Sequence, residues 1–293
     1  MRALHTRADP HRIIDDAWGD RLVPEVARDA LRQGAIAAAS TDHDTVADTD
    51  TDALVEAWLR SAAYATVITR SRFAEDALHL AVARGVTQYV LVGAGFDSYA
   101  LRSPPDSAHV DIYEVDHPAT QFLKRQRIRE CNLSVRDSVH FLAADLSSES
   151  LGSMLAKSNF ESTKPAFFSW LGVTMYLTRE ANLESLRSIA SSAAIGSELV
   201  FTYADQEAFD GHELTNSEIA KRVASIGEPF LSGFDPGTLA RDLKDVGFDL
   251  LEDLNDSQVV QRYDPRGLNG LKPLQHSRIA HARVTGVAGH GAA

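Results

Sequence analysis

The sequence predicts an α/β fold in which a mostly parallel sheet is covered by helices on both faces. Short apolar runs rich in β-branched residues alternate with longer segments of helical period. This alternation is typical of parallel strands joined by crossover helices. The first run ends in the Gly-Ala-Gly turn at 93–95, and the second ends in Glu-Val-Asp at 114–116. The chain shows no internal repeat and no low-complexity block, so 1–293 is expected to form one domain.

The segment before the first strand is predicted to be mainly helical. Residues 11–34 have the pattern of short helices joined by turns, and 54–65 carries apolar residues at helical spacing. A further helix fits 71–85, with Gly85 as its C-terminal stop. The Asp-rich stretch 48–59 lacks the glycine and glutamate that a calcium loop needs at its sixth and twelfth positions. It is therefore interpreted as a solvated loop that caps the next helix.

The alternation of strands and helices continues to the end of the chain. Strands are predicted at 88–92, 109–116, 138–146, 165–171, 197–205, directly after Gly247, and at 277–286. Helices are predicted at 118–131, where Pro118 opens the segment, at 178–193 and at 236–246. Residues 205–235 break this rhythm. They are predicted to form a helical insertion over the strand ends, where open α/β sheets bind ligands.

The composition narrows the class of protein. Acidic residues outnumber basic ones by 41 to 29, and a net charge of −12 disfavours a nucleic-acid partner. A single cysteine excludes a disulfide within the chain and favours a reducing compartment. No apolar run approaches the roughly 20 residues of a membrane span, and the first residues lack a signal-peptide core. We therefore expect a cytoplasmic protein without a membrane partner, while the oligomeric state stays open.

The glycine turn and the next two strand ends predict an adenosine site. Glycine lets a ligand approach bare backbone. Glu114 follows Gly93 at about the 20-residue spacing at which an acidic residue accepts from ribose hydroxyls in nucleotide-binding sheets. The third strand ends in Asp145 and Leu146. Asp145 can accept a hydrogen bond from an adenine amino group, and Leu146 can donate its backbone N–H.

The residues after the turn discriminate between adenosine cofactors. A dinucleotide site expects a third glycine where this chain has Ser98. Asp97 would repel a pyrophosphate, but it suits a sulfonium and an ammonium group. No tyrosine is followed by lysine four residues later, as the relay of many NAD-linked oxidoreductases would require. The charge pattern thus favours S-adenosyl-L-methionine over NAD.

The segments GAGFDSYALR, YEVDHPATQFLKRQ, AADL and WLGVTMYLT resemble the leucine carboxyl methyltransferase family. They resemble most its actinobacterial branch of predicted S-adenosylmethionine-dependent methyltransferases, from about Asp15 to the C-terminus. The resemblance implies a Rossmann-like class I methyltransferase fold with a seven-stranded, mostly parallel sheet. It also implies an N-terminal helical cap at 1–84, a cofactor-binding half at 85–204, the insertion at 205–235 over the active site, and the rest of the sheet at 236–293.

The resemblance also implies a set of cofactor contacts. Arg70 would pair with the methionine carboxylate, Glu114 with the ribose, and Asp145 with the adenine. Asp116, close to Glu114, either joins the site or only caps the following helix. Two positions depart from the family pattern, because many relatives have arginine at Tyr99 and glutamate at Leu171. The full set is Arg70, Gly93, Ala94, Gly95, Asp97, Glu114, Val115, Asp116, Asp145, Leu146 and Leu171.

Relatives in this family methylate oxygen, typically a carboxylate. We therefore expect an O-methyltransferase acting in line on the carboxylate of a small, acidic molecule or of a peptide. A carboxylate is already ionised at pH 7 and needs no general base, and no metal is expected. A sugar or natural-product hydroxyl is the alternative acceptor, and a base would then help. A non-catalytic S-adenosylmethionine-binding protein is a second alternative, favoured by Leu171.

Catalytic and substrate contacts carry weaker signals. Tyr176, Tyr203 and Asp205 follow or end the fourth and fifth strands and are the catalytic candidates, with His212 as a further possible base. Tyr176 is open to a second interpretation as core packing. In the stretch QRYDPRGL, the residues Arg262, Tyr263 and Arg266 are candidates for binding an acidic substrate, or else form a loop with scattered charge.

Overall fold

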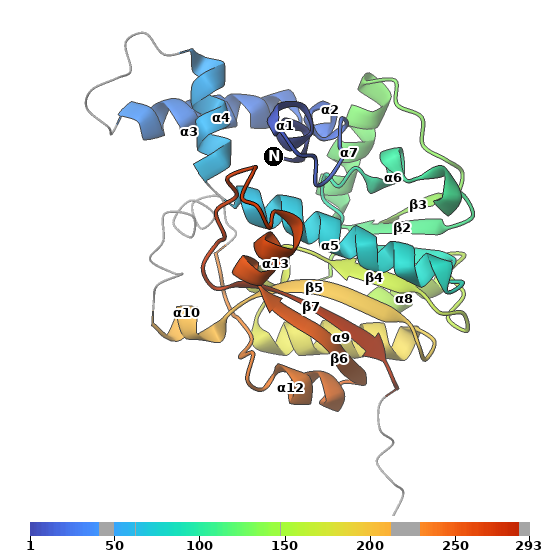
Figure 1. Ribbon diagram of the computed structural model, residues 1–293. Helices are drawn as coiled ribbons and strands as arrows, with labels where there is room; N and C mark the ends of the chain where they lie inside the picture. The colour runs from blue at the N-terminus through green and yellow to red at the C-terminus, as the bar shows by residue number, and fades with distance from the viewer. Residues whose placement is uncertain (41–49, 62, 147, 212–228, 287–293) are drawn as a thin grey trace, which may run out of the picture.

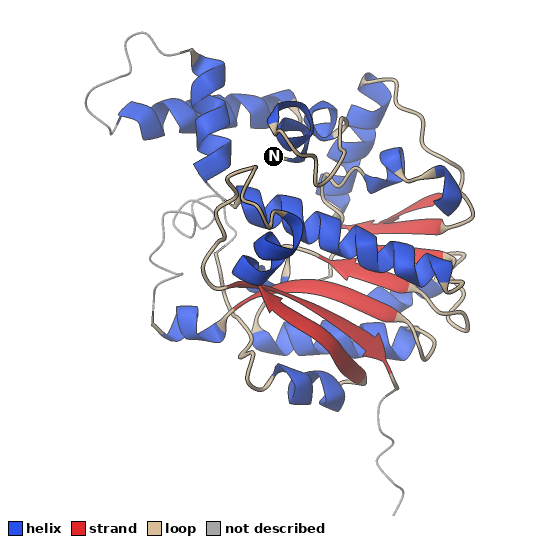
Figure 2. Ribbon diagram, in the orientation of Figure 1, coloured by secondary structure: helices blue, strands red, loops and turns tan. Residues whose placement is uncertain are grey.

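The computed structural model describes residues 1–40, 50–61, 63–146, 148–211 and 229–286. A seven-stranded sheet runs through its centre in the order β3-β2-β1-β4-β5-β7-β6, flanked by helices on both faces (Figures 1 and 2). Strand β7 is antiparallel to β5 and β6, and the other neighbouring pairs are parallel. The strands are β1 Gln88–Val92, β2 Asp111–Asp116, β3 Val139–Ala143, β4 Phe167–Trp170, β5 Glu198–Ala204, β6 Phe248–Asn255 and β7 Ser277–Val284. The predicted fold class is confirmed.

The strand order explains where a site can form. The chain builds β1, β2 and β3 outward in one direction and then returns to place β4 on the other side of β1. The crossovers that leave β1 and β4 diverge at this reversal, which leaves a crevice at the carboxyl ends of the two strands. Every residue of β1 and β4 is buried, as expected for central parallel strands covered on both faces.

Helices cover the two faces with separate apolar cores. One face holds α8 (Leu151–Ala156), α9 (Arg179–Ser192) and α12 (Leu239–Asp245), whose leucines pack on Val90, Phe168 and Phe201. The other face holds α5 (Tyr64–Ala83), α6 (Tyr99–Arg102) and α13 (Asp256–Tyr263), which pack on Tyr89, Leu91 and Ile112. Helix α7 (Pro118–Glu130) contacts β3 and α2 (Gly19–Leu22), and α10 (Gln206–Asp210) follows β5.

The N-terminal helices are arranged differently from the single cap expected over 1–84. Helices α1 (Arg2–Ala8), α2 (Gly19–Leu22), α3 (Glu25–Ser40) and α4 (Thr51–Ser61) lie beyond the carboxyl ends of the strands (Figure 1). Helix α5 instead packs on the sheet, and it begins at Tyr64 rather than near residue 71. Apolar spacing runs on from α4 into α5, so it does not reveal that a new helix starts there.

Helix α13 is absent from the sequence-based prediction. Its C-terminal part is predicted from the sequence either to bind substrate or to form a loop with scattered charge. Asn255 accepts from the backbone N–H of Gln258, and the Gln258 side chain accepts from the backbone N–H of Asn255. This reciprocal capping box is a readable helix-start signal. Among the helices described, none combines the length and apolar character needed to cross a membrane.

Candidate active site

The glycine turn brings bare backbone to the carboxyl end of β1. The N–H groups of Gly93 and Ala94 donate to the Val115 carbonyl at 2.9 and 3.1 Å, which ties the turn to β2. Gly93 and Gly95 have φ angles of +68° and +51°, in the left-handed region. A Cβ at position 93 would lie 2.6 Å from the Val173 side chain. Only glycine fits there, so the turn passes directly beside the loop that follows β4.

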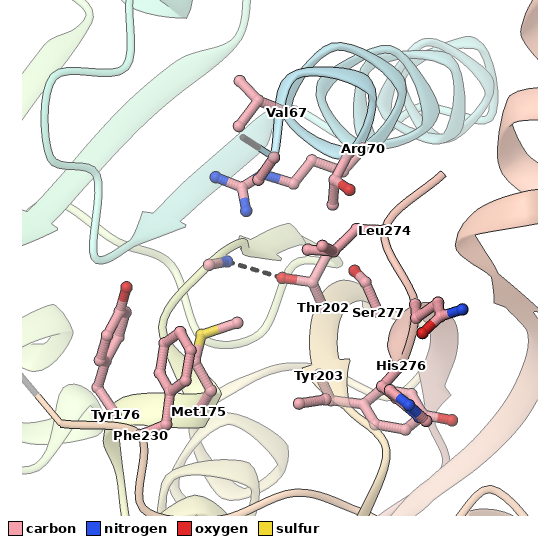
Figure 3. A pocket seen from close by; sticks show the side chains of 15 residues that line it. Val67, Arg70, Met175, Tyr176, Thr202, Tyr203, Phe230, Leu274, His276 and Ser277 are labelled. Carbon is pink, nitrogen blue, oxygen red and sulfur yellow. Dashed lines mark hydrogen bonds between the residues drawn. The ribbon is translucent and has the colours of Figure 1, made fainter. Parts of the chain in front are cut away.

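Two cavities meet at this edge of the sheet. The first, of about 380 Å³, is lined by the turn residues 93–97, by Ser169 of β4 and Leu171 directly after it, and by α1 and α2; we call it the turn cavity. The second, of about 400 Å³, is lined by Met175, Tyr176 and Phe230, with Thr202 of β5 and residues 274–277 (Figure 3); we call it the aromatic cavity. Both volumes lie within the range of small-molecule sites.

Arg70 of α5 borders both cavities. Its guanidinium lies against Gly172, where a Cβ would come within 2.8 Å of Nη1. Within the described part of the chain, Arg70 makes no hydrogen bond or ion pair. Burial, together with the charge of Arg2, lowers its pKa to about 10, so it remains protonated at neutral pH. A partly buried cation without a counter-charge is a site for an anionic ligand group.

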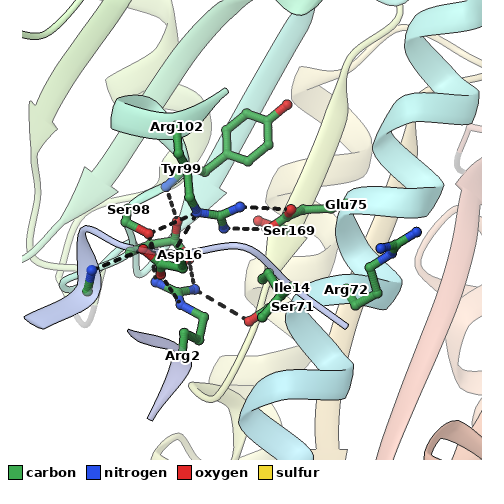
Figure 4. A network of polar contacts seen from close by, with 12 residues as sticks. Arg2, Ile14, Asp16, Ser71, Arg72, Glu75, Ser98, Tyr99, Arg102 and Ser169 are labelled. Atoms are coloured by element: carbon green, nitrogen blue, oxygen red, sulfur yellow. Dashed lines mark hydrogen bonds and ion pairs between the residues drawn. The ribbon is translucent and has the colours of Figure 1, made fainter. Parts of the chain in front are cut away.

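A polar network fixes the N-terminal helices over the turn (Figure 4). The Arg2 guanidinium pairs with Asp97 at 2.6 Å and with Asp16 at 2.8 Å. Ser98 donates to Asp16 at 2.6 Å and accepts from Arg102 at 3.0 Å. Burial alone would raise the pKa of Asp97, but Arg2 and Arg102 outweigh it and hold that pKa well below its usual range. Asp97 thus lines the turn cavity as expected, with its carboxylate bound to Arg2.

The acidic side chains of β2 depart from the expected arrangement. Glu114 is 1% exposed, and its carboxylate accepts from Lys124 at 2.5 Å. Asp116 lies at the strand end, where it accepts from the N–H of Gly95 and, at 2.6 Å, from that of His117. The two acids share a face of the strand, but Glu114 is two residues deeper. Glu114 is therefore misplaced as the ribose ligand, and Asp116 is the acid next to the turn.

The other expected cofactor residues occupy the same edge of the sheet. The N–H of Ala144 donates to the Asp116 carbonyl at 2.9 Å, which brings Asp145 and Leu146 next to the end of β2. Neither residue lines the turn cavity, and their adenine role stays a prediction. Leu171 does line it, next to Ser169.

Tyr99, where many relatives have arginine, is buried on α6. Its ring packs edge-on to Tyr89, with the ring centroids 5.1 Å apart. This contact belongs to the core that α6 shares with β1, behind the turn.

Two of the three catalytic candidates, Tyr176 and Tyr203, line the aromatic cavity. The Tyr176 ring lies 5.4 Å from that of Phe230. The Tyr203 hydroxyl instead donates to Asp253 at 2.9 Å and accepts from Arg278 at 2.9 Å. Burial, reinforced by Asp253, raises the pKa of Tyr203, which keeps its proton in place. These contacts give the Tyr203 hydroxyl a structural role, and its catalytic role stays a prediction.

Asp205 is also structural. Its carboxylate accepts from the N–H of Glu207 at 3.1 Å and caps α10. A carboxylate in that position serves the first turn of the helix. Asp205 does not line the aromatic cavity, and His212 lies outside the described residues.

The predicted substrate residues lie on the outer side of α5 and line neither cavity. Arg262 pairs with Glu252 at 3.2 Å and covers the Phe73 ring. Tyr263 donates to Asp76 at 3.0 Å, and Arg266 is exposed on the following loop. None of the three lies at either cavity, because α13 turns that segment toward α5 and solvent, and their substrate roles stay a prediction. The residues that do line the aromatic cavity include Thr202, Met175 and Phe230, which the sequence did not single out.

Known proteins resemble this chain over most of its length. A family model described as leucine carboxyl methyltransferase matches residues 1–190. YktD of Bacillus subtilis, named as a predicted S-adenosyl-L-methionine-dependent methyltransferase, is 29% identical over 286 residues, which cover 96% of this chain and 94% of that protein. A Mycobacterium marinum protein of the same description is 30% identical over 202 residues, or 69% of this chain and 62% of its own.

A solved structure shares the fold. The crystal structure of a duf574 family protein from Streptomyces avermitilis superposes with a TM-score of 0.51 at 16% identity, covering 74% of this chain and 82% of that one.

Proposed function

The chain belongs to the leucine carboxyl methyltransferase family, and from that premise we propose that it transfers the methyl group of S-adenosyl-L-methionine to a carboxylate oxygen of a small molecule or peptide. The observation that carries the proposal is the position of Arg70, a cation that pairs with no described residue and borders both cavities, one of which is lined by the glycine turn after β1. The turn cavity suits the methyl donor, and the aromatic cavity suits the acceptor.

The residues around the turn cavity fit the donor. The backbone at 93–95 is bare, and Arg70 offers a guanidinium for the methionine carboxylate. Asp116, held at the end of β2 by the N–H of Gly95, is in position to accept from the ribose hydroxyls. Asp145 and Leu146 would contact the adenine. The ammonium group of the donor would have fewer partners, because Leu171 is apolar and Asp97 is already paired with Arg2.

When bound, S-adenosyl-L-methionine supplies a methyl group on a positively charged sulfur, and an acceptor oxygen forms the new O–C bond as the S–C bond breaks and its electron pair stays on sulfur. The protein aligns the two reactants and excludes water from them. Arg70 and Gly172 fix the point at which the two cavities approach each other.

A carboxylate acceptor agrees with the charges of the aromatic cavity. No Asp or Glu is among the described residues that line it, and Arg70 is a lining cation. An anionic acceptor is attracted there, and it needs no base because it is ionised at pH 7. The hydrogen bonds of Tyr203 and Asp205 engage two of the side chains that could act as the base for a hydroxyl acceptor.

One observation favours a hydroxyl acceptor as the second candidate. His276 lines the aromatic cavity and has a φ angle of +61°, which is uncommon for a residue other than glycine. Strained backbone of this kind is often found at functional sites. An imidazole there would serve as the base.

Calorimetric titration tests the donor half of the proposal. S-adenosylhomocysteine and S-adenosyl-L-methionine should bind with micromolar affinity, and NAD should not bind. Binding of NAD alone would overturn the proposal. Turnover of acid and alcohol acceptors by wild type and His276→Ala then separates the two candidates, because carboxylate methylation should not depend on the imidazole.

A further inference from the structure

We infer that the acceptor is a small monocarboxylic acid with an aromatic tail, bound with its carboxylate at Arg70 and Thr202 and its ring against Tyr176 and Phe230. This inference rests on the proposed function, and it names the substrate class of the aromatic cavity.

The inner end of the cavity offers hydrogen-bond donors. Arg70 has five N–H groups, enough for a donor carboxylate on one side and an acceptor carboxylate on the other. The Thr202 hydroxyl oxygen accepts from the N–H of Gly172 at 2.7 Å, so its own hydrogen points elsewhere. No described residue accepts that hydrogen. A carboxylate at this end would receive bonds from both side chains.

Most of the remaining wall is apolar and aromatic, and its polar side chains include Thr66, Gln275, His276 and Ser277. Figure 3 shows Met175, Tyr176 and Phe230 across the cavity from Arg70. The rings of Tyr176 and Phe230 are inclined by 44° to each other, and a third aromatic group bound in the cavity would meet both residues in its wall. Val67 and Leu274 complete the apolar lining.

This distribution of polar and apolar groups disfavours other acid classes. A second carboxylate would lose its hydration on entering the cavity, and the described lining has no second cation to pair with it. Burying an unpaired charge in this way is costly. A peptide would bring amide groups that need partners along the Met175 and Phe230 wall, where the side chains offer none. An uncharged alcohol would leave Arg70 without an anion on the acceptor side. An aromatic tail matches the wall, and a carboxylate matches the inner end.

The test uses the full chain loaded with S-adenosylhomocysteine and four probes. These are 3-phenylpropanoate, succinate, 3-phenylpropan-1-ol and a tripeptide ending in leucine, with binding measured by saturation-transfer NMR and calorimetry. We expect 3-phenylpropanoate to bind at least about ten-fold more tightly than each of the others. With S-adenosyl-L-methionine in place of the product, its methyl ester should appear by mass spectrometry.

Two variants locate the bound probe. Phe230→Ala should weaken 3-phenylpropanoate binding about ten-fold, and Thr202→Val should weaken it several-fold, while the affinity for S-adenosylhomocysteine stays unchanged. Phe122→Ala is the matched control, because it removes the same ring from a position on α7 that is 62% exposed. It should alter neither affinity.

The outcomes separate the two proposals. If S-adenosylhomocysteine binds and 3-phenylpropanoate does not, or if succinate, the alcohol or the peptide binds as well as it does, the aromatic-acid inference is overturned while the methyltransferase proposal stands. If S-adenosylhomocysteine itself does not bind, both proposals fail.

Discussion

The turn cavity and the aromatic cavity share Arg70 but are built in opposite ways. The turn cavity is polar, and three of its lining charges are in ion pairs: Arg2 pairs with Asp97, and Asp20 pairs with Arg7 outside the cavity. The aromatic cavity is apolar apart from its inner end and rim. A site with paired charges holds its shape and recognises one ligand through backbone and a few fixed groups. A site with apolar walls selects its ligand mainly by shape and by the single charge at its end.

Removal of Arg70 should weaken ligand binding in both cavities at once, which is the largest effect we expect. Arg70→Ala should weaken S-adenosylhomocysteine binding about a hundred-fold, or ~2.7 kcal/mol, because a bidentate charged contact is lost. Calorimetry measures the affinity, and thermal unfolding should show no loss of stability, since Arg70 pairs with no described residue. Arg72→Ala, which removes an arginine paired with Asp76 on the same helix, is the control. Wild-type affinity in Arg70→Ala would remove Arg70 from the site.

The ion pairs of the turn cavity predict that stability depends on pH. Asp97→Asn should destabilise the protein by ~3 kcal/mol at pH 7, because Arg2 loses one of its two carboxylate partners. The pKa of Asp97 is depressed in the folded state, so its contribution is complete above the usual carboxyl pKa. It is then lost as the pH falls further. Denaturant unfolding of both proteins should show the difference shrinking below pH 4; a constant difference would contradict this linkage.

A methyl group at Gly172 should displace Arg70 without removing its charge. In Gly172→Ala the new Cβ would lie 2.8 Å from Nη1, and the residue has a φ angle of +73°. We expect S-adenosylhomocysteine affinity to fall about ten-fold and stability to fall by ~1 kcal/mol. Gly196→Ala has a φ angle of +90° and open space around the new methyl, so it should cost stability alone. Equal affinity in both variants would show that Arg70 tolerates displacement.

The smallest effect is expected from a substitution at Leu171, and it tests where the ammonium group of the donor lies in the turn cavity. Leu171→Glu places a carboxylate where the ammonium of the donor would lie, and it should tighten S-adenosyl-L-methionine binding about three-fold to ten-fold. A deaminated analogue of S-adenosylhomocysteine should gain nothing, and Leu171→Gln is the neutral control. Equal gains for the analogue would place position 171 away from the ammonium.

The difference between the cavities also explains what sequence reasoning found. The turn cavity is made from contiguous motifs, and strand β1 was predicted at its observed limits, 88–92. The error at Glu114 arose because it and Asp116 share a strand face and differ only in depth. The choice of Tyr203 rested on its position near a strand end, which does not tell what its hydroxyl bonds to. The aromatic cavity joins α5, the loop after β4, β5, Phe230 and 274–277, and no local pattern links them.

The position of Arg70 between the cavities has a consequence for divergence within the family. A substitution at this residue alters donor and acceptor binding together, so it is constrained twice over. Met175, Tyr176 and Phe230 border the aromatic cavity and not the turn cavity. Selection can therefore exchange these side chains, and with them the acceptor, while the affinity for the donor is inherited unchanged.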